Sequence, residues 1–113
     1  MKVSPRRGDL VRVILDPARG TASGKTIPAV VISNNSCNAY GARVVVVPVT
    51  SNVDSLYPGE VRIRVQGRQA RALGDQTRSL DKSRLRARIG RLDPEELAAL
   101  EDAVLVTLGI QKW

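Results

Sequence analysis

The chain of 113 residues carries side chains that can handle a phosphate at the two ends of one apolar stretch. Lysine and threonine precede the β-branched run Ile27–Ser33, and threonine, serine and asparagine close the run Val44–Thr50: these are Lys25, Thr26, Thr50, Ser51 and Asn52. Ammonium, hydroxyl and amide groups can all hydrogen-bond to phosphate oxygens. We therefore interpret this stretch as the centre of the core and as the floor of a functional site.

The segment from Gly20 to Thr26 reads G-T-A-S-G-K-T, which is close to a nucleotide-binding phosphate loop. It is one residue shorter than the pattern G-x-x-x-x-G-K-[ST], because position 19 is arginine. It also leads into a β-branched run that contains Pro28, so no helix N-terminus would face the phosphate. We reject nucleotide hydrolysis at this loop, but a basic glycine loop that touches a nucleic-acid phosphate remains open.

The composition excludes several other kinds of chemistry. With no histidine and one cysteine, Cys37, the chain has no ordinary zinc site, no histidine-based acid–base pair or triad, and no internal disulfide. One cysteine fits a reducing cytoplasm, and neither a signal-peptide core nor an apolar run of the ~20 residues that span a membrane is visible. The net charge of +7 favours a polyanionic partner, a nucleic acid or an acidic protein segment, over a basic surface without a partner.

Alternating and β-branched runs predict a small antiparallel β domain around this stretch, in a single domain spanning residues 1–113. The clearest alternation is in Glu60–Gln66, with valines and isoleucine inward and arginines outward. The other predicted strands are Asp9–Leu15, Ile27–Ser33, Ala42–Thr50, Ala72–Leu80 (one or two pieces, with Gly74 as the weak point) and Arg86–Leu92. Loops or turns are expected at 16–24, 34–41, 51–59 and 67–71, and Pro48 predicts a bulge or a local edge.

A helix is predicted at the C-terminal end of the domain. Asp93 is a suitable N-cap, Pro94 fits the first helical position, two glutamates complete a capping box, and Gly109 ends the helix. Its predicted apolar stripe is Leu97, Leu100, Val104 and Leu108. A single helical turn capped by Asp81 is expected at 81–85.

The segment 68–91 holds eight basic residues against two aspartates, and the helix after it is acidic. This contrast indicates a directed binding face, unless the basic residues only solvate an edge strand.

A series of short motifs runs along the chain: Arg7-Gly8-Asp9-Leu10-Val11, Leu15-Asp16-Pro17-Ala18-Arg19-Gly20, Pro28-Ala29-Val30-Val31-Ile32-Ser33, Asn38, Val47-Pro48-Val49-Thr50-Ser51-Asn52, Tyr57-Pro58, Asp75-Gln76-Thr77-Arg78-Ser79 and Ile89-Gly90-Arg91-Leu92. In this order they resemble the MazF/PemK family of toxins. Each motif alone is weakly specific, but together they extend the resemblance over nearly the whole chain.

The resemblance implies a fold, a reaction and partners. The fold is mainly β, a twisted antiparallel and partly open SH3-like barrel with a C-terminal helix, which forms a homodimer. The reaction is that of the toxin of a type II toxin–antitoxin system: a metal-independent, cofactor-free endoribonuclease that cuts single-stranded mRNA at specific sequences by 2′-hydroxyl attack. The protein partner is a cognate antitoxin whose acidic C-terminal tail occupies the RNA groove, and the location is the cytoplasm.

The resemblance also implies site residues. Thr50 matches the active-site threonine of the family, with Ser51 and Asn52 beside it as RNA contacts; the simpler account is that all three cap a strand end. Gln76 and Arg78 match positions at which the family touches its substrate, although a glutamine that satisfies backbone groups is an equally simple account.

Two positions depart from the family pattern. The arginine that usually precedes the proline is Ile27 here, and the usual Ser-Glu-Gln after the loop glycine is Thr21-Ala22-Ser23. Lys25 is the best catalytic substitute, because alternation places it on the face of Ile27, about 7 Å away along a strand. The alternative for Lys25 is a solvated loop lysine. Arg19 is a second candidate clamp for the RNA phosphate.

Two further hypotheses follow from these departures. Ile27 and Ala22 favour a catalytically impaired MazF-fold module that binds an antitoxin or nucleic acid without cleavage. Trp113 points, more faintly, to a gyrase-poisoning relative of the same fold.

Overall fold

β-Strands form most of the regular secondary structure in a computed structural model that describes residues 4–15 and 25–111. The strands are β1 (Asp9–Ile14), β2 (Thr26–Val31), β3 (Arg43–Thr50), β4 (Glu60–Val65), β5 (Arg68–Leu73), β6 (Arg78–Asp81) and β7 (Leu85–Arg91). The α-helices are α1 (Asn35–Tyr40) and α2 (Pro94–Leu108), and two short 3₁₀ helices are η1 (Gly74–Gln76) and η2 (Lys82–Arg84). Within the described residues, no helix is long and apolar enough to cross a membrane.

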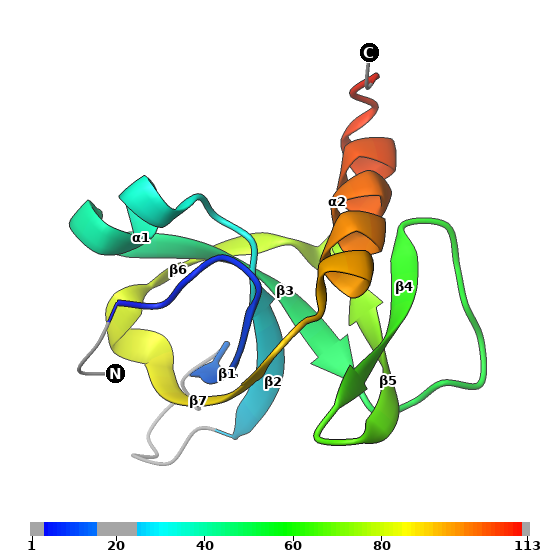
Figure 1. Cartoon of the computed structure of the whole chain (residues 1–113), viewed down its shortest axis with the longest axis horizontal. Coiled ribbons are helices and arrows are strands. Elements are labelled where there is room, and N and C mark those ends of the chain that lie inside the picture. Colours follow the sequence, from blue (N-terminus) through cyan, green and yellow to red (C-terminus); the bar gives the residue numbers. More distant parts are fainter. Residues whose placement is uncertain (1–3, 16–24, 112–113) are drawn as a thin grey trace.

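β3 is the central strand of the antiparallel sheet, whose order is β4-β5-β3-β2-β1-β7 (Figure 1). One edge of β3 pairs with β2, and the opposite edge pairs with β6 as far as Val46↔Arg78 and with β5 at Thr50↔Arg71. The β2–β3 pair therefore lies at the centre of the sheet, as its apolar sequence predicts. A strand that is covered on both faces reads as a continuous apolar run.

The edge of β3 that faces β5 and β6 is interrupted near Pro48. Between Thr50↔Arg71 and Val46↔Arg78, β3 advances by four residues while the opposite chain advances by seven. The three extra residues form η1. Pro48 has no N–H to donate, and it pairs only through β2 in the described residues, opposite Ala29. This agrees with the predicted local edge at Pro48.

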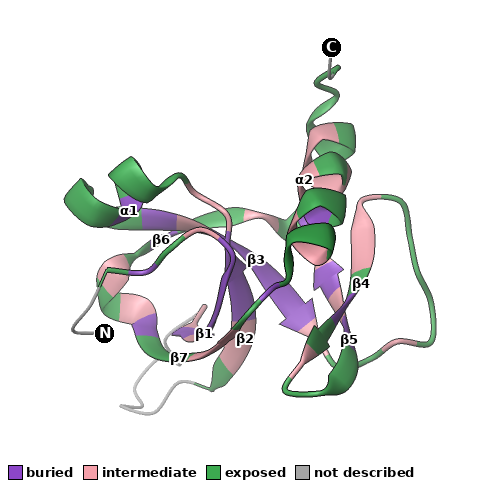
Figure 2. Cartoon of the chain, in the orientation of Figure 1, coloured by how far each residue is buried: buried purple, intermediate pink, exposed green. Residues whose placement is uncertain are grey.

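Two apolar cores lie on opposite faces of the central strands. Figure 2 shows that the residues of the central strand β3 are mostly buried. Val47 belongs to the first core, under α2, and its neighbour Val46 belongs to the second, because successive side chains of a strand point to opposite faces. The second core is surrounded by β1, β2, β3, β6 and β7, since β7 returns to pair with β1. Among the described residues β6 and β7 are joined by η2 and are not paired with each other, so this barrel is only partly closed. The predicted partly open antiparallel barrel is confirmed.

α2 begins and ends where the sequence predicts. The Asp93 carboxylate accepts the Glu96 N–H at 2.8 Å, Glu96 reciprocates at 3.1 Å, and Gly109 adopts a left-handed conformation with φ 71°. Leu100 is fully buried against the sheet. Leu108 is 62% exposed, so the apolar stripe that contacts the core is shorter than predicted.

Two local predictions were wrong. The segment 34–41 contains the helix α1, because the Asn34 side chain accepts the Cys37 N–H at 2.9 Å and thereby caps a helix too short to show an apolar period. The predicted turn 67–71 is mostly strand, because β5 begins at Arg68. The chain reverses within Gln66 and Gly67, whose φ angles are 51° and 81°.

Candidate active site

Thr50 lies at the end of β3, between β2 on one side and β5 on the other. The last β2–β3 pair is Ala29↔Pro48, and extending this register by two residues places Ile27 opposite Thr50. Lys25 precedes β2 by one residue and shares the face of Ile27 by alternation. This extension of the register, and not an observed pair, places Ile27 and Lys25 on the β2 side of Thr50. Lys25 is exposed, and Ile27 packs against the second core.

The Thr50 hydroxyl takes part in the turn that follows the strand. Its Oγ1 accepts the Asn52 N–H at 3.3 Å, and the Asn52 Oδ1 in turn accepts the Asp54 N–H at 3.0 Å. The side chains of Thr50 and Asn52 therefore cap the end of the strand, which is the simpler alternative given for them in the sequence analysis. A hydroxyl that accepts one hydrogen bond can still donate its own hydrogen to a phosphate oxygen.

On its other side, Thr50 pairs directly with Arg71 of β5. The Arg71 side chain is only 13% exposed, and its Nε lies 3.5 Å from Oε1 of Glu60, whose side chain is 6% exposed. Its Nη1 donates to the carbonyl oxygen of Ser55 in the loop that leaves Thr50. We did not single out Arg71 from the sequence. Its pairing with Thr50 depends on the register between β3 and β5, which no short sequence motif predicts.

Gln76 and Arg78 lie further along the same edge of β3. Arg78 pairs with Val46, four residues from Thr50, which is about 13 Å along a strand. Gln76 belongs to η1, between that pair and Thr50, and both side chains are exposed. Arg19, together with the departures at 21–23, lies outside the described residues.

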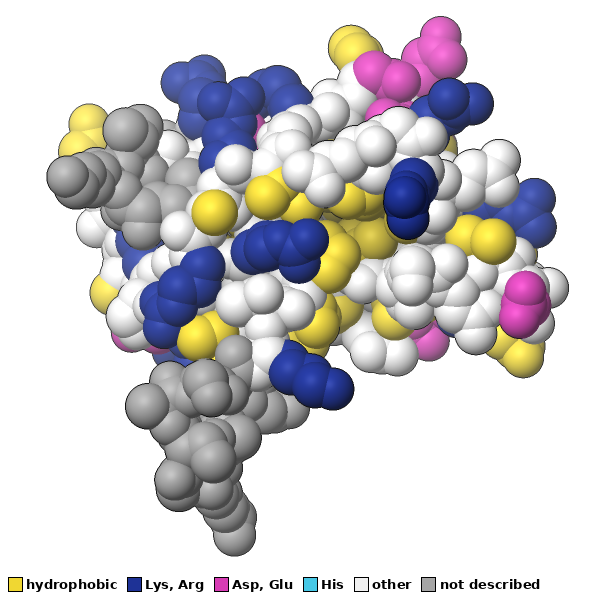
Figure 3. Space-filling model, turned by 90° about the horizontal axis from the view of Figure 1, so that it is seen from below, with side chains coloured by type: hydrophobic (Ala, Val, Ile, Leu, Met, Phe, Trp, Pro, Cys, Tyr) yellow, Lys and Arg dark blue, Asp and Glu magenta, His cyan; other side chains and the backbone are white. Residues whose placement is uncertain are grey.

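A groove of about 390 Å³ opens beside the end of β3. Ser51 lines it together with Arg12 and Arg68, over an apolar floor that includes Pro28 and Val49. Figure 3 shows this side of the molecule, where Lys and Arg side chains surround an apolar depression. A flat apolar floor with nearby guanidinium groups can accept an unstacked nucleobase and its phosphate.

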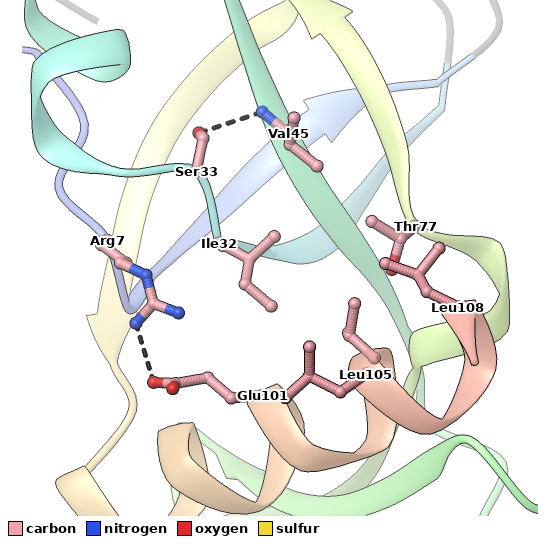
Figure 4. A pocket seen from close by; sticks show the side chains of 9 residues that line it. Arg7, Ile32, Ser33, Val45, Thr77, Glu101, Leu105 and Leu108 are labelled. Carbon is pink, nitrogen blue, oxygen red and sulfur yellow. Dashed lines mark hydrogen bonds and ion pairs between the residues drawn. The ribbon is translucent and has the colours of Figure 1, made fainter. Parts of the chain in front are cut away.

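A second concave surface of about 350 Å³ lies between α2 and the β2–β3 side of the sheet (Figure 4). Ile32, Val45 and Leu105 give it an apolar lining, and at its rim Arg7 forms an ion pair with Glu101 at 2.8 Å. At its C-terminal end α2 exposes the large apolar side chains of Val106 and Leu108, and Ile110 beyond the helix is exposed as well. Exposed large apolar side chains are common at protein–protein contacts.

Known proteins are similar to this chain in sequence and in fold. Residues 6–108 match the family described as PemK-like, MazF-like toxin of type II toxin-antitoxin system. The chain is 40% identical over 114 residues to the endoribonuclease MazF9 of Mycobacterium tuberculosis, which covers 93% of this chain and 97% of that protein.

Two solved structures give the same result. MazF from Deinococcus radiodurans has 30% identity and a TM-score of 0.80, with 96% and 99% of the two chains covered. A chain of the MazE-MazF crystal structure from the same organism has 29% identity and a TM-score of 0.82, again covering 96% and 99%. Their similarity spans the β barrel together with its C-terminal helix.

Proposed function

Because the chain belongs to the PemK-like, MazF-like toxin family of type II toxin–antitoxin systems, we propose that it is a sequence-specific, metal-independent endoribonuclease that cuts single-stranded mRNA. The observation that carries this proposal is the position of Thr50. It stands at the end of β3 as the direct cross-strand partner of Arg71. Its neighbours Val49 and Ser51, on the other face of the strand, line the groove flanked by two arginines. A protein with a net charge of +7 is also suited to an RNA substrate.

Cleavage without a metal is a transesterification within the RNA. The ribose 2′-oxygen attacks the adjacent phosphorus as its proton passes to a base, and the bond from phosphorus to the 5′-oxygen breaks as an acid protonates that oxygen. The products are a 2′,3′-cyclic phosphate and a 5′-hydroxyl. We assign to Thr50 a hydrogen bond to a non-bridging oxygen of the phosphorane. Lys25, on the same face, donates the proton to the leaving oxygen, and water accepts the proton of the 2′-hydroxyl.

RNA binding uses groups on both sides of this centre. Ser51 and Asn52 contact the nucleotide next to the scissile phosphate, and Gln76 and Arg78 contact nucleotides further along the edge of β3. Arg19 is proposed as a further contact to the phosphate. Such contacts make the affinity for RNA fall with salt, because each neutralised phosphate releases counterions.

Two protein partners complete the proposal. The relative from Deinococcus radiodurans is seen in a MazE-MazF crystal structure, which supports a cognate antitoxin for this chain, with an acidic tail that lies against the basic side of the groove. The exposed apolar side chains at and after the end of α2, those of Val106, Leu108 and Ile110, support a homodimer in which a second copy covers part of them. We place the protein in the cytoplasm, where it meets mRNA.

One observation favours a second function, a module that binds without cutting. Ile27 fills the position of the usual catalytic arginine and packs against the second core as a hydrocarbon. In that case the protein would hold an antitoxin or RNA and leave the RNA intact.

Incubation of the purified protein with mixed single-stranded RNA in EDTA, followed by mapping of fragment ends, separates the two functions. The ribonuclease predicts cuts at a defined sequence, with 2′,3′-cyclic phosphate ends, and their loss in Thr50→Ala. Thr107→Ala removes a hydroxyl that is exposed on α2 and serves as the matched control. Intact RNA that is still bound by the wild-type protein would refute the proposal and support the binding module.

A further inference from the structure

The β2 side of Thr50 supplies no cation at the position of the usual arginine. Ile27 lies there and is packed against the second apolar core. The phosphorane that forms during RNA cleavage carries more negative charge than the ground state, and enzymes stabilise it with preorganised donors and cations. If the chain cuts RNA, a positive group should therefore reach the phosphate from another direction.

The other neighbour of Thr50 carries such a group. Arg71 of β5 is the direct cross-strand partner of Thr50. Side chains in such a pair share one face of the sheet, with Cβ atoms roughly 5 Å apart. An arginine is always charged and its planar fork matches two phosphate oxygens at once, so this position suits a phosphate ligand.

The surroundings of Arg71 hold it in a defined orientation. Glu60 lies beside its Nε, and the Ser55 carbonyl accepts from its Nη1. Glu60 is itself fixed, because its Oε1 accepts the Tyr57 N–H at 2.9 Å. The largely buried Arg71 side chain thus lies next to Thr50 and is bonded to the loop that leaves Thr50.

One donor of this guanidinium is not satisfied. The Arg71 Nε is buried and has no hydrogen-bond partner among the described residues, since its contact with Glu60 at 3.5 Å does not meet hydrogen-bond geometry. Buried donors without a partner are rare in native proteins, because each costs the full desolvation of the group. Because this Nε is buried beside the Glu60 carboxylate, it holds the guanidinium in place, and a phosphate would meet the terminal nitrogens instead.

We propose that Arg71 is a catalytic residue of this chain, a guanidinium from β5 that contacts the scissile phosphate beside Thr50 and replaces the cation missing at Ile27. The inference rests on the proposed ribonuclease function. Arg71 transfers no proton in this role. It donates hydrogen bonds to the non-bridging oxygens while the bond to the 2′-oxygen forms and the bond to the 5′-oxygen breaks, and Glu60 keeps it in place.

The test compares Arg71→Gln, Arg71→Lys and the matched control Arg62→Gln. Arg62 is the cross-strand partner of Arg71 on β4 and is exposed, so its loss removes the same charge from the same sheet, one strand further from Thr50. Cleavage is measured in single turnover at saturating RNA. Affinity is measured separately with the same RNA carrying 2′-O-methyl groups, which cannot be cut.

We expect Arg71→Gln to slow cleavage by about 10²- to 10³-fold. The affinity should change far less, and the rate should recover in part when guanidinium ion is added below denaturing concentrations. Arg71→Lys keeps the charge beside Glu60 but not the fork, and should lose at least about tenfold. Arg62→Gln should remain within about threefold of the wild type.

Each other outcome has a definite meaning. If Arg71→Gln or Arg71→Lys is folded and cuts RNA as fast as Arg62→Gln, Arg71 has no catalytic role, while the ribonuclease function stands. If Arg71→Gln does not fold, the cleavage rate of Arg71→Lys decides whether Arg71 is catalytic. If activity falls but guanidinium ion restores none of it and the affinity falls in parallel, Arg71 only maintains the loop, and the inference is wrong. The same assay also includes Thr50→Ala. If the wild-type protein cuts no more RNA than Thr50→Ala does, the proposed ribonuclease function itself is wrong.

Discussion

Gly74 lies directly against the main chain of Gly59: a Cβ added to Gly74 would be 2.2 Å from the Gly59 carbonyl oxygen. This contact joins η1, the insertion beside β3, to the end of the 51–59 loop that leaves Thr50. Gly59 has a φ of 86°, a conformation that residues with a Cβ rarely adopt. Two glycines distant in sequence therefore bring both segments that flank the candidate active site into contact.

Gly74→Ala should destabilise the protein by about 1–3 kcal/mol, because the backbone around η1 must shift to admit the methyl group. The free energy of unfolding in denaturant measures the effect. Gly90→Ala is the control: its Cβ would meet the Leu10 side chain at an ordinary 3.6 Å, and its stability should change by no more than about 0.5 kcal/mol. Equal stabilities for the two variants would contradict the observed packing of Gly74 on Gly59.

Ile27→Arg should increase RNA cleavage, because it places a cation beside Thr50 from the β2 side. The gain should be larger in the Arg71→Gln background, by about tenfold or more, since the two arginines would stabilise the same phosphorane charge. Ile27→Met, which keeps a hydrocarbon at this position, should not accelerate cleavage in either background. If Ile27→Arg is folded and no faster, residue 27 does not occupy the position of the missing arginine.

Leu108→Glu should convert the proposed homodimer into a monomer, because it places a carboxylate among the exposed apolar side chains near the end of α2. Light scattering after size-exclusion chromatography gives the mass directly. Tyr40→Glu is the matched control, since Tyr40 is 91% exposed on α1 and is not among the side chains near the end of α2. A Leu108→Glu protein that remains dimeric would place the subunit interface elsewhere.

The cap of η2 should be visible in the pH dependence of stability. The Ser83 main-chain N–H donates to the Asp81 carboxylate at 2.8 Å, and this bond, with a smaller contribution from the Ser83 side chain, lowers the pKa of Asp81. A carboxyl whose pKa is lowered on folding stabilises the protein above its unfolded pKa, and this stabilisation is lost as the pH falls through the folded pKa.

Asp81→Asn should therefore lower the melting temperature near neutral pH, and the difference from the wild type should shrink once the pH falls below about 4. The effect is small because Asp81 is exposed and its charge is screened by water and salt. Ser83→Ala keeps the main-chain donor and should preserve most of this pH dependence. A difference that is constant from pH 7 to about pH 2 would show that the lowered pKa does not contribute.

Sequence signals predicted the elements whose causes are local. Asp93 and Gly109 mark the ends of α2 because capping depends on a few neighbouring residues. The alternation in 60–66 predicted β4 with its buried Ile63 and exposed arginines. α1 was missed because its signal is one asparagine cap without an apolar period, and the start of β5 was missed because Gln66, a residue with a Cβ, adopts a positive φ.

The candidate site could be predicted only in part. Thr50 was assigned to the site through its motif, and its catalytic role stays a prediction. The β2–β3 register, extended by two residues, places Ile27 opposite it. Arg71 could not be found, because it faces Thr50 only after the turn at 66–67 sets the β4–β5 register and η1 absorbs three residues. Such non-local pairings are set by the packing of the whole sheet, and no short stretch of sequence contains them.

The pairing of β1 with β7 bears on when the barrel can form during synthesis. Asp9 forms an ion pair with Arg91 at 3.1 Å and stands opposite it in the β1–β7 register. The barrel that surrounds the second core is therefore incomplete until both strands have left the ribosome. Contacts between segments so distant along the chain also form slowly. A nascent chain that ends before β7 cannot complete the barrel, so the proposed ribonuclease would stay inactive until β7 has been made.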